Sequence, residues 1–374
     1  MYTTKVFHSI CEIDAGQWDK VGSEAALARS HAYLQAVEEA SINDAEFFYP
    51  AVFDDGDLVA HCCVYTISTD FRQMLPRPLQ AFITQLRKYW PGFLIVRVTE
   101  CCSPLVADHS ISTEDGASRP ELIVLLAKAI ETLAKEQRSP LVVIRDFLAS
   151  DRAAFDVLCT HGFNVVSNMP LARIKVRWDS YDNYLQAMRS RYRKDVKRRL
   201  KRAERSGQRV RRIKNFGQLA ATWVKQAAVV FENTKGFKRE KLAPAYYQNI
   251  NKKLPEHSEL LAIERDGELV AHGMLVNDQK NTTATYFGRD PGKPNSEWFQ
   301  LMNEVIRIGI NRQSEYINLG LGSYDAKANV GADVEPLYVY SKSRYRVVNW
   351  LMKIVPRTMD CHDKPAKRVF HDQG

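Results

Sequence analysis

The sequence predicts an α/β protein of the mixed α+β type, built from two similar halves. Its 374 residues are enough for two domains, each with its own core. The heptapeptide DGDLVAH at 55–61 returns as DGELVAH at 266–272, and each copy stands between two apolar runs. Apolar segments around Asp-Gly are typical of a β-hairpin, because Asp and Gly tolerate positive φ in the turn. The repeat therefore predicts a duplicated unit that contains one such hairpin.

The order of elements after each hairpin also repeats. In the first half the patterns predict a helix at 120–137, a buried strand at 141–145, a short helix at 151–160 closed by Gly162, and a strand at 164–176. In the second half they predict a helix at 298–311, a strand at 316–321, a short segment at 324–330 that leads to Gly331, and a final strand at 334–340. Residues 70–104 are extra in the first half, so we expect an insertion there.

Between the halves, residues 180–206 carry apolar side chains at spacings of three and four, with Ser180 and Gly207 as end signals. This pattern predicts one amphipathic helix and places a domain boundary near Arg177, giving domains 1–177 and 178–374. Residues 189–212 hold thirteen Lys and Arg against two acids, a net charge of +11. The whole chain carries +9, so the remainder sums to −2 and the basic character is local.

The order hairpin, strand, helix, strand, short helix ending in Gly, strand is similar to that of the GNAT acyltransferase fold. The stretch AFDVLCTHGF at 154–163 resembles its helix-to-strand corner. Two such halves resemble the double-GNAT branch, which contains the Fem-type aminoacyl transferases. The basic segment 191–207 is similar to the helix that opens the second half in that branch, and KANVG at 327–331 matches its Lys-x-x-apolar-Gly element.

This resemblance implies an acyltransferase that moves an acyl or aminoacyl group from a large activated donor to an amine. It places Lys327 beside the carbonyl under attack, as a stabiliser of the oxyanion. The other interpretation is a solvated charge near a helix C-terminus. His272 is a candidate base, although His61 at the same place in the first half favours a structural role. Further candidates at strand ends are Tyr286, Tyr324 and Asp325.

The segment RDPGKP at 289–294 stands where single-domain acetyltransferases bind the coenzyme A pyrophosphate. Arg289, Gly292 and Lys293 are therefore candidate donor-binding residues. Pro294 removes an N–H group where the family loop has Gly or Ala, so the match is partial. A coenzyme A thioester remains one candidate co-substrate. We expect no tightly bound cofactor and no metal, since the seven cysteines show no Cys-x-x-Cys spacing.

The basic helix has two interpretations. Arg198, Arg199, Lys201 and Arg202 either form a solvated face or bind a polyanionic donor, such as an aminoacyl-tRNA, an acyl carrier protein or a coenzyme A thioester. A different class of function is a non-catalytic RNA-binding module on a GNAT-like scaffold. Tyr192 is the one aromatic residue inside the basic run, which disfavours that class.

The N-terminal residues lack a secretory signal pattern, and no apolar stretch is long enough for a membrane span, so we expect a cytoplasmic protein. The segment RYRVVNWLMKIVPR at 344–357 combines an apolar helical face with cations. Such a helix either docks on its own domain or makes peripheral contact with an anionic membrane.

Overall fold

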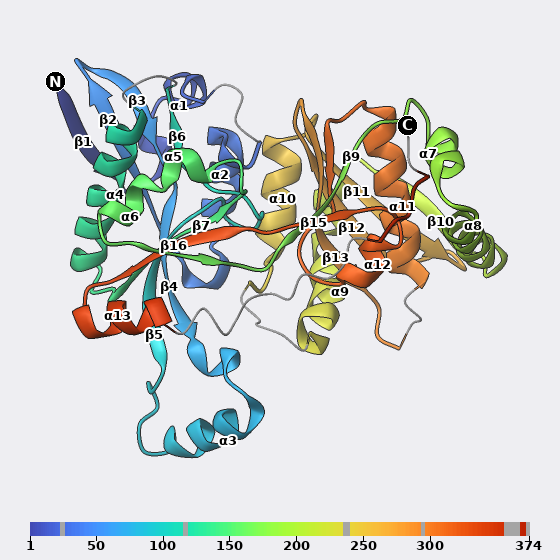
Figure 1. Ribbon diagram of the computed structural model, residues 1–374. Helices are drawn as coiled ribbons and strands as arrows, with labels where there is room; N and C mark the ends of the chain where they lie inside the picture. Colours follow the sequence, from blue (N-terminus) through green and yellow to red (C-terminus); the bar gives the residue numbers. More distant parts are fainter. Residues whose placement is uncertain (23–26, 115–118, 235–239, 293–295, 355–366, 372–374) are drawn as a thin grey trace.

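The computed structural model describes residues 1–374 except 23–26, 115–118, 235–239, 293–295, 355–366 and 372–374. The chain forms two lobes side by side, and each lobe has one mixed β-sheet with helices on its faces (Figure 1). This architecture confirms the predicted fold class.

The first sheet has nine strands in the order β6-β3-β2-β4-β5-β7-β16-β8, with β1 also paired to β2. Its strands are β1 (Tyr2–Phe7), β2 (Glu46–Asp54), β3 (Asp57–His61), β4 (Val64–Asp70), β5 (Ile95–Cys101), β6 (Ser112–Thr113), β7 (Leu141–Phe147), β8 (Asn164–Ser167) and β16 (Tyr338–Ser343). Its helices are α1 (Ala15–Lys20), α2 (His31–Glu38), α3 (Arg77–Leu86), α4 (Arg119–Glu136), α5 (Arg152–Phe155), α6 (Val157–Thr160) and α13 (Arg346–Ile354).

The second sheet has seven strands in the order β10-β11-β12-β13-β14-β9-β15. They are β9 (Leu171–Lys175), β10 (Arg209–Ile213), β11 (Ser258–Arg265), β12 (Glu268–Asn277), β13 (Asn281–Arg289), β14 (Tyr316–Asn318) and β15 (Asp333–Glu335). The helices of this lobe are α7 (Tyr181–Ala187), α8 (Ser190–Arg205), α9 (Ala220–Asn233), α10 (Pro244–Lys253), α11 (Ser296–Asn311) and α12 (Tyr324–Ala328).

The two repeated heptapeptides form equivalent hairpins. Asp55 and Gly56 have φ of 47° and 99°, and Asp266 and Gly267 have φ of 53° and 80°. Both turns therefore use two positive-φ positions, which Asp and Gly accept at low cost. Both hairpins also shift register after the second residue pair from the turn, between Val52 and Phe53 in one and between 263 and 264 in the other. The shared irregularity confirms that the repeated sequence forms a repeated structure.

The ends of the two halves depart from the expected strands. Residues 164–176 form two strands, β8 and β9, separated by Pro170, and residues 333–343 form β15 and β16, separated by Pro336. In each case the second strand joins the other half's sheet: β9 lies between β14 and β15, and β16 lies between β7 and β8. Proline ends the first strand because it lacks an N–H group for the ladder. The expected boundary near Arg177 therefore separates halves that exchange a strand.

The predicted single helix at 180–206 is two helices, α7 and α8, with a break at Met188 and Arg189. Both residues are extended there. Met188 forms an isolated bridge with Phe370, and the Arg189 amide donates to the Val369 carbonyl at 2.9 Å. The prediction of a continuous helix was wrong because the segment that interrupts it lies far away in the sequence.

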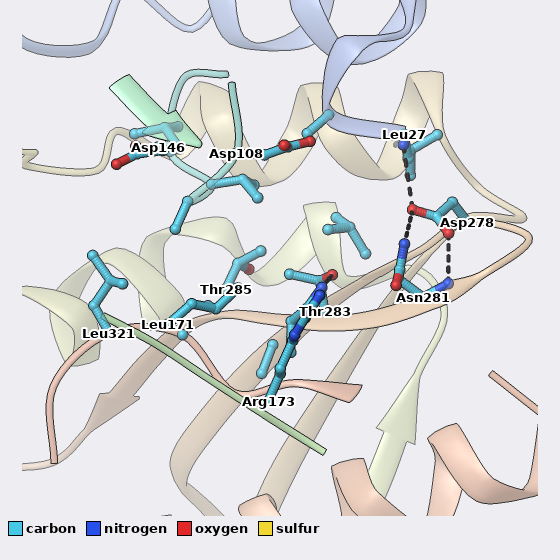
Figure 2. A pocket seen from close by; sticks show the side chains of 18 of the residues that line it. Leu27, Asp108, Asp146, Leu171, Arg173, Asp278, Asn281, Thr283, Thr285 and Leu321 are labelled. Carbon is cyan, nitrogen blue, oxygen red and sulfur yellow. Dashed lines mark hydrogen bonds between the residues drawn. The ribbon is translucent and has the colours of Figure 1, made fainter. Parts of the chain in front are cut away.

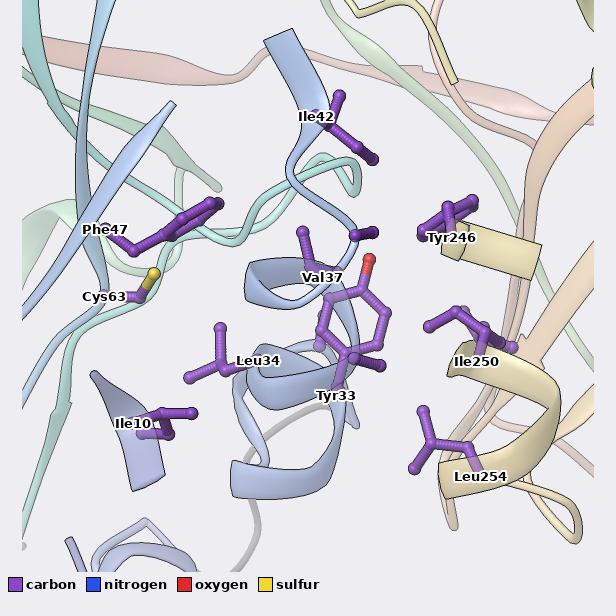
Figure 3. Close-up of a cluster of buried hydrophobic side chains, with 14 of the residues drawn as sticks. Ile10, Tyr33, Leu34, Val37, Ile42, Phe47, Cys63, Tyr246, Ile250 and Leu254 are labelled. Carbon is purple, nitrogen blue, oxygen red and sulfur yellow. The ribbon is translucent and has the colours of Figure 1, made fainter. Parts of the chain in front are cut away.

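The two lobes share one of the molecule's hydrophobic cores. Tyr33, Leu34 and Val37 of α2 belong to the same buried cluster as Tyr246 and Ile250 of α10 (Figure 3). Polar contacts add to this packing, among them a Lys253–Glu39 ion pair at 3.0 Å. The shared core fixes the two lobes against each other, so a cleft between them is a built feature of the fold.

None of the helices within the described ranges is both long and apolar enough to cross a bilayer.

Candidate functional site

A cavity of about 440 Å³ lies between the two lobes. One wall comes from the second sheet and carries Thr283 and Thr285, while the opposite wall carries Asp108 and Asp146 of the first lobe (Figure 2). Arg173 of the exchanged strand β9 also lines it. Because a cleft of this size with convergent polar groups is the usual form of a small-molecule site, it is the candidate active site.

On the second-half wall, the sheet opens at a seam between β13 and β14. The two strands pair in parallel only where residues 281–283 of β13 lie beside residues 316–318 of β14. β13 continues to Arg289, and β12 pairs with its other edge along that stretch. Within the described part of the chain, the edge of β13 beyond Thr283 has no strand partner, so backbone groups there can bind a ligand.

A second, apolar cavity of about 170 Å³ lies on the far side of this seam, under α11. Its apolar lining includes Trp298, Leu301, Met302 and Val305 of that helix. Five residues line both this cavity and the cleft between the lobes: Ala284, Thr285, Tyr286, Gly320 and Leu321. All five belong to β13 or to the segment after β14, so the two cavities meet at the seam.

Lys327 lines the apolar cavity. It lies in the short helix α12, and only 4% of the residue is exposed. Its ammonium donates to the carbonyls of Gly320 and Leu321, both at 2.9 Å. Burial lowers the pKa of Lys327 to about 8, because a charged group loses hydration there. Two of the three N–H groups of the ammonium donate to these carbonyls. The third can donate a hydrogen bond to a substrate oxygen.

On the first-half wall, Arg145 and Asp146 lie near the end of strand β7. The Arg145 guanidinium donates to Glu100 at 2.9 Å, to the Tyr65 hydroxyl at 3.0 Å and to Asp146. Asp146 has φ of 74° at a register shift between β7 and β16, and it accepts a bond from Asn168. Burial raises the pKa of the Asp146 carboxyl. A non-glycine residue in a left-handed conformation beside a cleft is typical of a functional site.

Asp108 is the more accessible acid of this wall. Its side chain is 22% exposed, against 0% for that of Asp146. The Arg29 guanidinium binds both carboxylate oxygens of Asp108, at 3.2 and 3.3 Å. The pKa of Asp108 is nevertheless raised, because burial outweighs the charge of Arg29.

Charges of both signs line the cleft, and they nearly balance. The cations are Arg29, Arg145 and Arg173, and the acids are Asp108, Asp146, Glu240 and Asp278. A polyanion would meet as much repulsion as attraction there, whereas a polar amine or an amino acid fits this balance.

The residues predicted from the sequence do not all meet at this site. Tyr286 and Lys327 both line the apolar cavity. Burial raises the pKa of Tyr286, and its hydroxyl lies 3.5 Å from Glu240. Tyr324 instead packs against the core of the second lobe, and Asp325 forms an exposed ion pair with Lys367 at 3.6 Å. Of the candidates in α12, therefore, Lys327 alone lines one of the two cavities described above.

His272 is fully buried, and both ring nitrogens have partners. Nε2 lies 2.9 Å from the Tyr247 hydroxyl and Nδ1 lies 2.9 Å from the Gln226 amide oxygen. Burial lowers the pKa of His272 to about 3, and that of His61 also to about 3. Each ring packs beside a tryptophan, Trp18 in the first lobe and Trp223 in the second. These matched positions support the structural interpretation and argue against His272 as a base.

The candidate phosphate loop precedes α11, and its described residues 289–292 line neither the cleft nor the apolar cavity. Arg289 is half-buried and Gly292 is exposed with φ of 70°, while Lys293 lies outside the described residues. The first turn of α11 carries Glu297, which is fully buried, accepts from Gln208 at 3.2 Å and lies 3.9 Å from Arg265. A helix N-terminus attracts one anion, and here the chain supplies its own carboxylate.

The four predicted donor-binding cations of α8 lie at the outer end of the second lobe (Figure 1). Arg198 and Arg199 share Asp195 as an ion-pair partner, and Arg199 also stacks on Phe299 of α11. Lys201 and Arg202 are exposed. None of the four lines the cleft. Their predicted role in donor binding thus concerns a surface separate from the candidate active site.

Sequence reasoning missed the first-half wall. Arg145 and Asp146 lie at the end of a strand that begins with a buried apolar run, which is the same strand-end signal that singled out Tyr286. Asn318 at the end of β14 carries that signal too. Arg29 ends a three-residue 3-10 helix and Asp108 lies in an irregular segment, so no periodic pattern marks either residue.

No group of three or more His, Cys, Asp or Glu side chains is placed to hold a metal ion among the residues that the structure describes.

The fold has two GNAT-like halves with a cleft between them. The sequence matches the FemAB-like family, described as peptidoglycan biosynthesis/recognition, over residues 9–302. The chain therefore belongs to the FemAB-like family, which confirms the predicted resemblance and the prediction of a transferase.

The chain is also similar to the following three proteins. A putative 8-amino-7-oxononanoate synthase 2 of Mycobacterium tuberculosis is 22% identical over 312 residues, which cover 81% of this chain and 40% of that protein. The chain thus spans less than half the length of this relative. FemX has a TM-score of 0.58 and 12% identity, covering 93% of this chain and all of its own. A tandem GNAT protein from the clavulanic acid pathway has a TM-score of 0.52 and 9% identity, covering 92% and 98%.

Proposed function

We propose that this protein transfers an acyl or aminoacyl group to an amine at the seam between β13 and β14. The observation that supports this most is the position of the seam. It opens to a polar cleft on one side and to an apolar cavity with a buried lysine ammonium on the other. An acyl transfer needs these three features: a place for the acyl group, a place for the amine, and a donor to the oxyanion.

The apolar cavity is the proposed site of the acyl group or amino-acid side chain. Its volume of about 170 Å³ is close to the ~150 Å³ of a cavity that holds benzene. We therefore expect it to accept groups of up to about six carbons. Burial of such a group against Met302 and Leu301 is favourable by about 25 cal/mol per Å² of apolar surface.

The polar cleft is the proposed site of the acceptor. An amine enters as an ammonium ion, and Asp108 is the cleft acid with the more exposed side chain. Its raised pKa suits it to take the proton that the nitrogen loses. The neutral nitrogen then attacks the donor carbonyl, a C–N bond forms, and the bond from the carbonyl carbon to the carrier's oxygen or sulfur breaks. The nitrogen loses its second proton to that oxygen or sulfur, so the carrier leaves as the alcohol or thiol.

Lys327 is the proposed stabiliser of the tetrahedral intermediate. Its ammonium is held by two backbone carbonyls, so it keeps its place while the negative charge develops on the oxyanion. A fixed cation in a site of low polarity stabilises that charge without reorganisation.

The donor is proposed to be an acyl or aminoacyl ester or thioester on a polyanionic carrier, with the carrier body bound by α8. Helix α11 contacts α8 on one side and lines the apolar cavity on the other. The basic surface is thus one helix layer, or about 10 Å, from the proposed acyl site. The buried Glu297 at the start of α11 disfavours a coenzyme A pyrophosphate there.

The test is an acyl-length profile measured by mass spectrometry of the amide product. Carriers loaded with acyl groups of increasing length are offered with an amine to the wild type and to Met302→Ala, which enlarges the cavity. Ile306→Ala is the control, because Ile306 lies on the same helix and is fully buried but does not line the cavity. We expect only Met302→Ala to shift the preferred length upward.

A length profile that is the same in all three proteins would refute the assignment of the acyl site. A protein that binds RNA but transfers no group from any carrier would instead support the RNA-binding alternative.

A further inference from the structure

Two segments at one end of the first lobe expose large apolar side chains that the proposed function does not use. The first is an arm, residues 71–95, which contains α3 and projects from the body (Figure 1). The second is residues 343–354, which contain α13. We call the exposed residues of these two segments the end surface.

Strand register brings the two segments to the same end of the sheet. Leu141 at the start of β7 pairs with Ser343 at the end of β16 and with Val98 of β5. The arm connects β4 to β5, and its two ends lie together because Asp70 of β4 pairs with Ile95 of β5. Figure 1 shows α3 and α13 at this same end of the lobe.

The arm presents its aromatic residues to solvent. Phe82, Tyr89 and Trp90 are 64%, 89% and 62% exposed, while Ile83 is the buried residue of α3. Exposed aromatic and aliphatic side chains gathered on one projection mark an interaction site.

Helix α13 is attached to the sheet by a polar residue and not by its apolar face. The Asn349 side chain donates to the Gly162 carbonyl and accepts from the Ser343 amide and from Asn164. Val347 and Trp350, in contrast, are 70% and 59% exposed. A helix that docks on its own domain buries its apolar stripe, so the expectation of simple docking does not account for α13.

The charge of the end surface identifies its partner. Residues 71–95 contain four Lys and Arg, residues 343–354 contain three, and neither segment contains an Asp or Glu. Asp70 at the base of the arm is bound by Arg87 at 2.7 Å. Cations interleaved with Trp, Tyr and Phe are the composition of surfaces that lie in the headgroup region of anionic bilayers.

We propose that the end surface binds the protein peripherally to an anionic phospholipid membrane. The aromatic side chains of α3 and α13 enter the headgroup region, and the arginines and lysines around them bind lipid phosphates. The cleft lies at the opposite end of β7, roughly 15 Å from Leu141 along the strand, so binding leaves it open.

The test is co-sedimentation of the full chain with vesicles of phosphatidylcholine alone or mixed with phosphatidylglycerol, together with tryptophan fluorescence. We expect binding to the anionic vesicles, weaker binding at high salt, and a blue shift of the emission. Phe82→Ser combined with Trp350→Ser should lower the affinity at least tenfold. Circular dichroism checks that this double variant remains folded.

The control replaces Arg198, Arg199, Lys201 and Arg202 by Gln. This control removes four positive charges, whereas the double variant removes none. Because the four cations lie far from the arm, the control should retain vesicle binding. Failure of the wild type to bind anionic vesicles would overturn the proposal, as would equal binding by the double variant. A concentration-dependent dimer that the double variant abolishes, without vesicle binding, would assign the end surface to a second copy of the chain instead.

Discussion

The two halves share a hairpin, a buried histidine and a helix closed by glycine, yet they differ at the seam. In the second half, β13 runs six residues beyond its pairing with β14, and a cavity is lined by this part of β13 and by the segment that follows β14. In the first half, β5 ends at Cys101, which is still paired with Ile144 of β7. The equivalent seam is therefore closed.

The residues around the closed seam are core residues. Leu158, at the position four before Gly162 that corresponds to Lys327, is fully buried in an apolar cluster with Phe155 and Phe163. Cys101 and Cys102 are also fully buried. The duplication thus produced two scaffolds: one has a cavity on each side of its β13–β14 seam, and the other supplies the facing wall of the cleft.

The largest effect that we predict from this comparison is on stability. Leu158→Lys gives the first half the lysine of the second but no cavity to hold it. An ammonium left without partners in a core should lower the free energy of unfolding by about 3–5 kcal/mol. Denaturant unfolding measures this. Leu158→Met, which conserves volume, should cost less than about 1.5 kcal/mol. Wild-type stability for Leu158→Lys would show that the first seam is open after all.

The pH dependence of turnover should report the buried lysine. Because burial lowers the pKa of Lys327 to about 8, we expect the single-turnover rate to fall about tenfold per pH unit above that value. The ordinary value is 10.5, so between the two values the unfolded chain binds more protons than the folded one. The free energy of unfolding should therefore gain a contribution that increases with pH from about 8 to 10.5. Lys327→Met should show neither feature.

The smallest predicted effect on stability concerns the basic helix, which has no counterpart in the first half. Replacing Arg198, Arg199, Lys201 and Arg202 by Gln should change stability little, since such surface changes cost within about 0.5 kcal/mol each. If α8 binds a nucleic-acid carrier, the slope of log affinity against log salt should become shallower by up to about four. Equal affinities at low and high salt for both proteins would favour the solvated interpretation.

Local patterns were enough to predict most of the fold. The Asp-Gly turns, the apolar stripes of α4 and α11, and the glycines that close α6 and α12 all depend on neighbours within a few residues. The strand-end signal singled out Tyr286, and the resemblance to the Fem-type transferases singled out Lys327; the structure brings both to one cavity.

The rest of the structure depends on contacts between residues far apart in the sequence. Pro170 and Pro336 mark the ends of β8 and β15, but nothing near them shows that β9 and β16 continue in the opposite sheets. The break between α7 and α8 depends on the bridge between Met188 and Phe370. The cleft forms because Asp108 of the first lobe and Thr283 of the second lobe face each other. Single-sequence patterns contain no information on such pairings.

The most direct test of the central claim is the single-turnover transfer rate of Lys327→Met at saturating donor. Leu158→Met serves as the matched change in the first half, and Lys327→Arg keeps a cation in place. If the second seam is the site of chemistry, Lys327→Met should be slower by about 100- to 1000-fold, with little change in donor affinity. Leu158→Met should transfer at the wild-type rate, and Lys327→Arg should recover part of the loss. A folded Lys327→Met protein that transfers at the full rate would contradict the account, because the open seam would then have no part in catalysis.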